Sequence, residues 1–317
     1  MKYDVIVIGG GPTGINSGIH CSKAGLNYLI LEKGVLVNSI YNFPVNMTFF
    51  STSKKLEIGK IPFISHNEKP TRREALEYYR RIMEAFDLQI QFDSKVVDIS
   101  GEDGNFRIDT EKESFHAKKI IISTGFYDKP RMLNIPGEDL PKVKHYYDDV
   151  HLYLKKNIVV IGGANSACDV ALECLQKGAN VTMIVRSPEL YERVKYWILP
   201  NIKNRIKEGS ITAYFNSEVT HIYEDKVEFK TPEGTNTVAN DFVLAMTGYT
   251  PDLEWLNKLG LSISEDKKPD VNEELESSVK GIYLAGVVVG GEQTSTFFIE
   301  NTRHHPKLIV DDIMKQR

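Results

Sequence analysis

Cysteine is scarce in this sequence of 317 residues, which contains only Cys21, Cys168 and Cys174. Three scattered thiols are too few for the disulfide framework of a small secreted protein, and their spacing does not provide the ligand pairs of a zinc site. This usage is typical of a reducing compartment. We therefore expect a cytoplasmic protein without a bound metal.

Long hydrophobic runs and an excess of basic charge are also missing. No stretch approaches the roughly 18 consecutive apolar residues of a membrane span, and the first apolar run, Val5–Ile8, is too short for a signal peptide. Lysine and arginine together number 39 against 43 aspartate and glutamate residues, which gives a formal net charge of −4. There is thus no basic footprint for nucleic acid or for an anionic membrane. A small molecule or a small protein is the expected partner.

The residues that are present are those of a folded chain with room for two domains. Hydrophobic residues make up 41% of the sequence and charged residues 26%, as in chains that bury a full core. Domains usually span about 100–200 residues each, so two is the expected number.

The first nucleotide-binding signature lies near the N-terminus. The β-branched run Val5–Ile8, a helical stretch from Pro12 to about Ala24 and a second apolar run, Tyr28–Leu31, together predict a βαβ unit. The loop after the first strand has the pattern Gly-x-Gly-x-x-Gly, at Gly9, Gly11 and Gly14. Such glycines allow a tight turn, the close approach of a pyrophosphate and the packing of helix on strand, and the helix N-terminus supplies N–H donors. The alternative is a glycine-rich turn with a purely structural role.

An acidic residue follows the second strand of this unit. Glu32 lies 18 residues after Gly14, where a carboxylate accepts hydrogen bonds from an adenosine ribose. The same carboxylate would repel a 2′-phosphate. FAD is therefore the expected cofactor at this loop.

A second unit of the same kind occurs in the middle of the chain. A strand at Ile158–Ile161 precedes the loop Gly162-x-Ala164-x-x-Ala167, which is followed by a helix through Gln176 and a strand at Val181–Val185. Ala164 departs from the glycine pattern, and we expect its methyl group to push a bound phosphate slightly outward.

The second strand of this unit is followed by Arg186 and Ser187 rather than by an acid. Because a guanidinium binds phosphate oxygens bidentately, this pair favours the 2′-phosphate of NADPH over NADH. The alternative is that Arg186 is only a solvated surface charge. A basic residue at this site and an acidic one at the first predict a hydride path from NADPH to FAD.

Further segments complete an α/β pattern. We expect a helix at Arg72–Phe86 and surface strands within Gln89–Ile99 and Phe106–Asp109. Buried strands are expected to end at the turns Thr124-Gly125, Thr247-Gly248 and Gly286. The predicted fold class is α/β with two Rossmann-like, three-layer dinucleotide-binding domains. The NADPH domain, residues 131–246, is inserted into the FAD domain, residues 1–130 and 247–317.

Longer motifs resemble one family of flavoproteins, the reductases with two dinucleotide-binding domains that are related to low-molecular-weight thioredoxin reductase. Within it the chain resembles the YpdA-type bacillithiol-disulfide reductases, also called bacilliredoxin reductases. The segments that carry the resemblance are Glu32–Gly34, Asn38–Asn42, Thr48–Ser53, Leu56–Gly59, Thr124–Asp128, Ile135–Asp139, Trp197–Pro200 and Phe298–Asn301. The resemblance covers essentially the whole chain, and it implies FAD, NADPH, a homodimer and a disulfide acceptor linked to a low-molecular-weight thiol.

The motifs and the resemblance together give the expected cofactor contacts. For FAD they are Gly9, Gly11, Pro12, Thr13, Gly14, Glu32, Lys33, Ser39, Ser51, Val97, Thr124, Gly125, Gly286, Val287 and Phe297. For NADPH they are Gly162, Ala164, Asn165, Ser166, Ala167, Arg186, Ser187, Thr247 and Gly248.

Two departures from the family concern the redox chemistry. Thioredoxin reductases carry a Cys-x-x-Cys before the second nucleotide strand, whereas residues 145–151 contain no cysteine. YpdA-like members have a cysteine in the first glycine loop, and this chain has Thr13 there, so thiolate attack from that position is impossible. A flavin that acts directly on the substrate and a Thr13 that only hydrogen-bonds the flavin are both compatible with this. No catalytic residue is assigned.

The remaining cysteines do not replace the missing thiols. Cys168 and Cys174 are six residues apart on one predicted helix, hence on different faces, and cannot form an unstrained disulfide. Structural packing is the expected role of both, and of Cys21 in the first helix.

Other polar and aromatic residues leave alternatives open. His304, His305 and Glu300 are acid–base candidates, although a solvated helix turn is the commoner role of such residues. We expect Tyr127–Lys129 to shape the connection between the domains. Trp197–Pro200 are expected either to dock a partner or to be buried against the other domain or a dimer mate.

The sequence thus predicts an NADPH-dependent flavin oxidoreductase that reduces a bacillithiol-type disulfide or its redoxin partner. One alternative is a flavoprotein that passes electrons to ferredoxin, a quinone or oxygen, which needs no cysteine. Another is a redox-sensing protein that holds FAD and NADPH without fast turnover.

Overall fold

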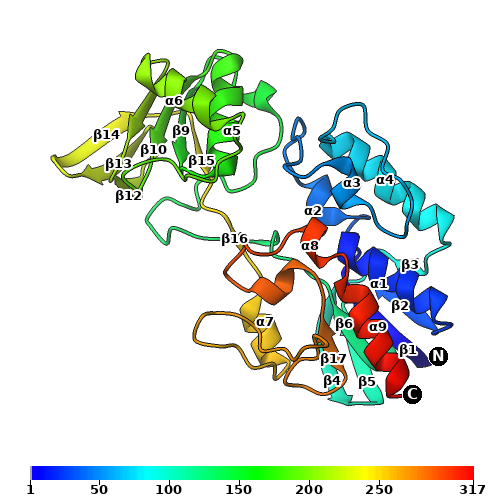
Figure 1. The fold of residues 1–317 in the computed structure, drawn as a ribbon. Coiled ribbons are helices and arrows are strands. Elements are labelled where there is room, and N and C mark those ends of the chain that lie inside the picture. The colour runs from blue at the N-terminus through cyan, green and yellow to red at the C-terminus, as the bar shows by residue number, and fades with distance from the viewer. Residues whose placement is uncertain (1) are drawn as a thin grey trace. The chain divides into compact units, whose positions relative to one another are not determined.

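The chain divides into two units in the computed structural model, which describes residues 2–317 (Figure 1). The first unit contains the chain up to Asn42, Met47–Lys129 and Tyr249–Arg317. The second contains Phe43–Asn46 and Pro130–Gly248.

The second unit takes in residues that we had expected in the first. Thr247 and Gly248 belong to it, as does Pro130. Phe43–Asn46 also belong to it, since the Val45 N–H donates to the Asp148 carbonyl at 3.3 Å and the Asn46 amide donates to the Glu173 carboxylate at 2.6 Å. The expected boundary at residue 130 was therefore incomplete, because a short segment far from it in the sequence packs with the second unit.

A seven-stranded sheet forms the first unit. Its order is β3-β2-β1-β6-β5-β4, with β17 paired to β6 off this path. The strands are β1 (Lys2–Ile8), β2 (Tyr28–Leu31), β3 (Ile90–Gln91), β4 (Val96–Glu102), β5 (Asn105–Thr110), β6 (Ser114–Ile122) and β17 (Ile282–Leu284). The strands β1, β2, β3, β6 and β17 are parallel, which buries the centre of the sheet on both faces. Val5, Ile6 and Val7 accordingly have no exposed surface.

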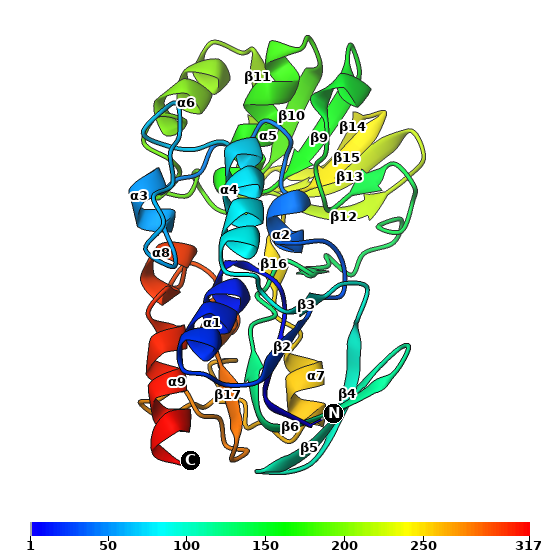
Figure 2. The same ribbon diagram turned by 90° about the vertical axis from the view of Figure 1, so that its right-hand side faces the viewer.

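The helices of the first unit are labelled in Figures 1 and 2. They are α1 (Pro12–Lys23), α2 (Asn38–Tyr41), α3 (Ser53–Leu56), α4 (Arg72–Ala85), α7 (Leu253–Lys258), α8 (Ile299–Thr302) and α9 (His305–Lys315), with the 3-10 helix η2 (Val287–Gly290). Helix α1 packs closely on β2 because Gly18 has no side chain; a Cβ there would lie 2.7 Å from the Ile30 Cδ1. Helices α1 and α9 lie side by side.

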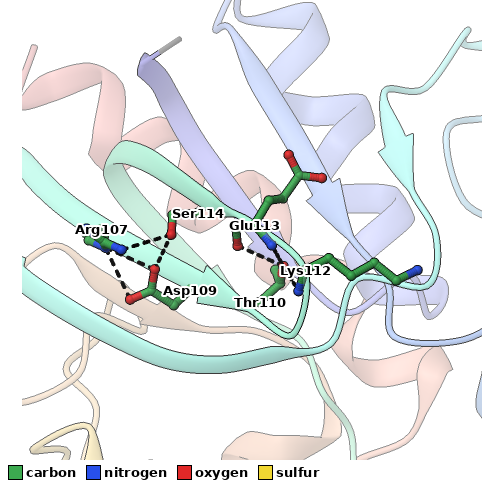
Figure 3. A network of polar contacts seen from close by, with 6 residues as sticks. All are labelled: Arg107, Asp109, Thr110, Lys112, Glu113 and Ser114. Atoms are coloured by element: carbon green, nitrogen blue, oxygen red, sulfur yellow. Dashed lines mark hydrogen bonds and ion pairs between the residues drawn. The ribbon is translucent and has the colours of Figure 1, made fainter.

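An antiparallel extension, β4 and β5, completes the sheet beside β6. The turn from β5 to β6 is closed by Thr110, whose hydroxyl donates to the Glu113 carbonyl at 2.8 Å and accepts from the Lys112 and Glu113 N–H groups (Figure 3). Arg107 and Ser114 bind the carboxylate of Asp109 across the same turn. These contacts stabilise the hairpin, and the cluster lies in the antiparallel extension rather than beside either glycine loop.

A parallel five-stranded sheet, of order β11-β10-β9-β15-β8, forms the centre of the second unit. Its strands are β8 (Val143–Lys144), β9 (Asn157–Ile161), β10 (Asn180–Ile184), β11 (Ile211–Tyr214) and β15 (Phe242–Ala245). Its helices are η1 (Val150–Tyr153), α5 (Asn165–Gln176) and α6 (Leu199–Lys207). An antiparallel sheet of β12 (Glu218–Ile222), β13 (Lys226–Thr231) and β14 (Gly234–Ala239) completes it.

The chain passes between the units through two short strands. They are β7 (Lys129–Pro130) and β16 (Tyr249–Thr250), which form a two-stranded sheet of their own. No helix among residues 2–317 is long and apolar enough to cross a membrane.

Candidate dinucleotide-binding sites

Strand register brings the expected residues of the first site to one edge of the first sheet. Ile8 pairs with Leu31 and with Ile122, and Ile122 pairs with Leu284. The loops that follow these four parallel strands therefore begin side by side. The carboxyl edge of a parallel sheet is where open α/β folds bind their ligands.

The three glycines of the first loop have different structural roles. Gly9 has φ of +106°, and a Cβ on it would lie 2.6 Å from the Ser123 carbonyl oxygen. A Cβ on Gly14 would lie 1.8 Å from the Gly9 carbonyl oxygen, so only glycine fits there. A Cβ on Gly11 would meet nothing within 4 Å. The fold itself requires the first and third glycines, whereas the second faces open space that a pyrophosphate can occupy.

The start of helix α1 carries donors for an anion. Gly11 is the N-cap, Pro12 occupies the first turn, no side chain caps the helix and no acidic residue lies in its first turn. The first helical hydrogen bond runs from the Ile15 N–H to the Gly11 carbonyl at 2.9 Å. The amides before Ile15 have no helical acceptor, so this end of the helix favours a phosphate.

The Glu32 side chain binds the backbone of the first glycine loop. Its two carboxylate oxygens accept hydrogen bonds from the Gly10 N–H at 2.6 Å and the Gly34 N–H at 2.9 Å, and the residue is only 4% exposed. Burial raises the pKa of this carboxyl, although the two amides oppose the shift. A carboxylate offers about four acceptor positions, so Glu32 can hold the loop and still accept from a ribose.

A buried hydroxyl that sequence analysis missed lies beneath the loop. Ser123 follows β6 and is 8% exposed, and its Oγ has no hydrogen-bond partner among the described residues. Its Cβ lies 3.6 Å from the position a Cβ on Gly14 would take. A buried polar atom without a partner marks a place for a ligand group or a bound water. No sequence pattern distinguishes this serine from an ordinary strand end.

A second unexpected contact lies where β17 ends. The Gly286 N–H donates to Nδ1 of His305 at 3.2 Å, and a Cβ on Gly286, whose φ is +89°, would lie 2.8 Å from the Thr13 Oγ1. His305 is 4% exposed, and burial lowers its pKa to about 4. The expectation of a solvated turn is therefore wrong for His305 and right for His304, which is exposed. Burial favours the neutral imidazole, whose Nδ1 accepts the hydrogen bond from the Gly286 N–H.

The other residues expected at the first site also lie in the first unit. Lys33 forms an ion pair with Asp128 at 2.7 Å. The Val97 carbonyl accepts from the Trp255 indole at 3.4 Å, and Val97 is 44% exposed. The half-buried positions are Ser39, Ser51, Thr124, Gly125, Val287 and Phe297.

The second loop repeats the geometry of the first at the carboxyl edge of its own sheet. Ile161 pairs with Ile184 and with Ala245. Gly162 has φ of +129°, and a Cβ on it would lie 2.7 Å from the Met246 carbonyl oxygen. Ala164 is the N-cap of α5, with no side-chain cap and no acid in the first turn. The departure from glycine at this position thus leaves the helix start intact.

Asn165 uses its side chain within the protein. Its Oδ1 accepts from the Lys195 N–H at 2.8 Å and its Nδ2 donates to the Arg193 carbonyl at 3.3 Å. The Tyr191 N–H also donates to the Gly163 carbonyl, at 2.9 Å. These bonds fold the segment from Tyr191 to Lys195 over the second loop. The backbone N–H of Asn165 and the second N–H of its Nδ2 remain for a phosphate.

The Arg186 side chain, which we expect to bind the 2′-phosphate, is accessible to a ligand. Arg186, Ser187 and Ser166 are exposed. The Thr247 hydroxyl, by contrast, donates to the Arg131 carbonyl at 2.6 Å, and the Arg131 N–H donates to the Gly248 carbonyl at 2.9 Å. Thr247 and Gly248 are therefore bound to Arg131 within the second unit.

Residues near the connection make contacts within the first unit. The Tyr127 ring lies 4.2 Å from that of Tyr249, and Lys129 forms an ion pair with Asp252 at 2.7 Å.

Among residues 2–317, no cluster of three or more His, Cys, Asp or Glu side chains could hold a metal.

Comparison with known proteins agrees with this arrangement. Residues 6–286 match the family described as pyridine nucleotide-disulphide oxidoreductase. The bacilliredoxin reductase Bdr of Bacillus subtilis (strain 168) is 43% identical over 320 aligned residues, which cover 100% of this chain and 99% of that protein. The solved structure of the bacillithiol disulfide reductase Bdr (YpdA) from Staphylococcus aureus has a TM-score of 0.96 at 39% identity, with 100% of this chain and 99% of that chain covered. The corresponding Bacillus cereus structure has a TM-score of 0.97 at 40% identity, with 100% of both chains covered.

These matches confirm the predicted resemblance and the α/β fold class. The pyridine nucleotide-disulphide oxidoreductases use a flavin and a nicotinamide cofactor, in agreement with two glycine loops of the kind described. The chain therefore belongs to the pyridine nucleotide-disulphide oxidoreductases and, within them, to the bacilliredoxin reductase family.

Proposed function

We propose that this enzyme uses FAD at the first loop and NADPH at the second to reduce a bacillithiol-type disulfide or its redoxin partner. The observation that carries the cofactor assignment is the opposite charge beside two otherwise similar loops, with Glu32 at the first and Arg186 at the second. The substrate is inferred from the activity named for relatives that are 39–43% identical over the whole chain.

The residues of the first loop fit FAD. The space beside Gly11 and the amides at the start of α1 suit the pyrophosphate, and the remaining acceptor positions of Glu32 suit the ribose hydroxyls. Gly286, just after β17, donates its N–H to His305 and lies next to Thr13 of the same loop. When bound, the flavin supplies the ability to accept a hydride and to donate two electrons.

The second loop fits NADPH. The amides at the start of α5 suit the pyrophosphate, and Gly162 provides the tight turn that leads into this helix. Arg186 and Ser187 suit the 2′-phosphate, because a guanidinium offers paired donors. The fold of Tyr191–Lys195 over the loop keeps this segment next to the nucleotide. The chain would act in the cytoplasm as a homodimer, as the thiol content and the resemblance indicate.

An anaerobic titration tests the proposal. Purified protein should carry a flavin that bleaches near 450 nm with one equivalent of NADPH and recovers when bacillithiol disulfide or oxidised bacilliredoxin is added. Bleaching without recovery would refute the disulfide acceptor. NADH that is as effective as NADPH would refute the assignment of Arg186.

A second candidate function is electron transfer from NADPH to ferredoxin, a quinone or oxygen. The observation that favours it is Thr13, which places no thiol in the first loop. Rapid recovery of the oxidised spectrum with one of these acceptors, and none with a disulfide, would establish it. Bleaching that no acceptor reverses would favour a redox-sensing role.

A further inference from the structure

The cysteines of this chain share one property. Cys21, Cys168 and Cys174 are free thiols, and none of them has any exposed surface. Thiol–disulfide exchange requires a thiolate to reach a sulfur of the disulfide directly. A substrate in solution therefore cannot meet any of the three sulfurs while the described fold is intact.

Cys21 is remote from the first loop. It lies in the last turn of α1, ten residues after Gly11 and hence about 15 Å along the helix from the loop. Burial, with Asp4 nearby, raises the pKa of its thiol to about 12.

Cys168 and Cys174 are buried in the core of the second unit. Both belong to the apolar cluster that contains Tyr147 and Ala171. The Cys168 thiol points to the Gly163 carbonyl at 3.9 Å, beneath the second loop. Burial raises the pKa of each thiol to about 12. They cannot act as a dithiol, because six residues of α-helix separate their Cα atoms by about 9 Å, beyond the roughly 7 Å limit for a disulfide.

From this placement we infer that the enzyme reduces its disulfide substrate without using any thiol of its own chain. The inference rests on the proposed function. The overall reaction is NADPH + H⁺ + RSSR giving NADP⁺ + 2 RSH. NADPH is oxidised by loss of the hydride at nicotinamide C4, and its two electrons reduce and break the S–S bond. Two S–H bonds form, one with the hydrogen equivalent of that hydride and one with the H⁺ taken from solution. No protein sulfur changes its oxidation state, and no mixed disulfide between enzyme and substrate is formed.

A cysteine-free enzyme provides the first test. The variant Cys21→Ala/Cys168→Ala/Cys174→Ala should retain full flavin content and reduce bacillithiol disulfide with kcat/KM within about threefold of the wild type. Ferricyanide reduction by NADPH, which needs no thiol, is the control for intact cofactor sites. A variant that reduces ferricyanide normally but loses disulfide reduction more than tenfold would overturn the inference. A wild-type enzyme that reduces ferricyanide but no disulfide would instead refute the proposed function.

A second measurement uses the wild type and so does not depend on the variant folding. Native enzyme reduced with NADPH is exposed to N-ethylmaleimide, and a parallel sample is acid-quenched during turnover with bacillithiol disulfide. Intact mass should show no alkylation before unfolding, three alkylated residues after it, and no added bacillithiol in the quenched sample. Rapid alkylation of the native reduced enzyme, or a bacillithiol adduct on any of the three cysteines, would overturn the inference.

Discussion

Gly11 and Gly14 are glycines of the same motif, yet they are required for different reasons. A side chain on Gly14 would collide with backbone inside the loop, whereas one on Gly11 would enter empty space. A side chain at position 14 would therefore disturb the apoprotein itself, whereas a side chain at position 11 would interfere only with a bound ligand. The two positions can therefore be separated by experiment.

We expect Gly11→Val to give a stable but colourless protein. Its φ of −72° is ordinary for valine, so thermal unfolding of the apoprotein should change little, while the side chain would occupy the pyrophosphate path. Gly14→Ala is the matched comparison and should lower the unfolding temperature of the apoprotein itself. Flavin absorbance per protein and calorimetry measure both. A yellow Gly11→Val protein would refute the first-site assignment.

Arg186→Ala should weaken NADPH far more than NADH. A charge-assisted hydrogen bond contributes about 1.5–3 kcal/mol, which corresponds to a rise of roughly 10- to 150-fold in KM for NADPH. Steady-state kinetics with both cofactors provide the measurement. Lys203→Ala, an exposed cation on α6, is the control and should change neither value. Equal effects of Arg186→Ala on both cofactors would show that Arg186 does not contact the 2′-phosphate.

His305 should make stability depend on pH in the acidic range. Its pKa is about 4 in the folded chain against 6.5 when exposed, so the unfolded state binds the extra proton first. The contribution is complete above pH 6.5 and is lost as the pH falls towards 4, by at most about 2 kcal/mol between pH 7 and 5. Urea unfolding at both pH values measures this loss. His305→Asn, which keeps an acceptor for the Gly286 N–H, should show a smaller loss, and an unchanged loss would contradict the assignment.

Sequence alone predicted the residues that are close together in the chain and missed those that meet through folding. The glycines and Glu32 belong to one βαβ unit, whose geometry is set by short-range pattern. Burial of His305 follows from the packing of α9 and the end of β17, and the unpartnered hydroxyl of Ser123 follows from its position beneath the loop. Neither depends on a local pattern, so neither could be predicted.

Secondary-structure elements show the same division. The run at Tyr28–Leu31 was predicted with its observed bounds as β2, and the helix predicted at Arg72–Phe86 is α4. The strand expected within Gln89–Ile99 is interrupted, because Asp93 adopts a left-handed φ of +50° between β3 and β4. Hydrophobic alternation predicts the presence of strands there but not a turn that one residue creates.

The start of α4 carries a capping box that should stabilise the first unit. The Thr71 hydroxyl accepts from the Glu74 N–H at 3.2 Å, and the Glu74 carboxylate accepts from the Thr71 N–H at 2.7 Å. Thr71→Ala should lower the free energy of unfolding by about 1 kcal/mol, and Thr71→Ser should lower it much less. Urea denaturation followed by circular dichroism compares the two. Equal losses would show that the methyl group of Thr71, rather than its hydroxyl, is what matters.

At the scale of the whole molecule, hydrophobic clusters belong to separate units. One cluster is built around β1, β6 and β17 of the first unit, and two others are built around the parallel sheet of the second. Each unit also carries its own glycine loop at the carboxyl edge of its own sheet. The two cofactors should therefore stabilise different parts of the chain.

Calorimetry of the apoprotein should show two unfolding transitions, one for each unit. FAD at about 100 times its Kd should raise one transition by an amount that corresponds to about 2.7 kcal/mol, and 2′,5′-ADP at the same ratio should raise the other. Arg186→Ala should abolish only the second effect. A single transition that either ligand raises would show that the units unfold together.

The segment Phe43–Asn46 has a consequence for how this protein can be divided. Four residues from the first third of the chain pack with a unit whose remaining sequence begins nearly ninety positions later. No single cut of the gene can therefore release the second unit complete, and a fragment of residues 130–248 would lack the partners of Asp148 and Glu173. Exchange of this unit between related reductases would therefore require grafts at two places. A chimera that exchanged only residues 130–248 would combine them with a Phe43–Asn46 segment from the other protein.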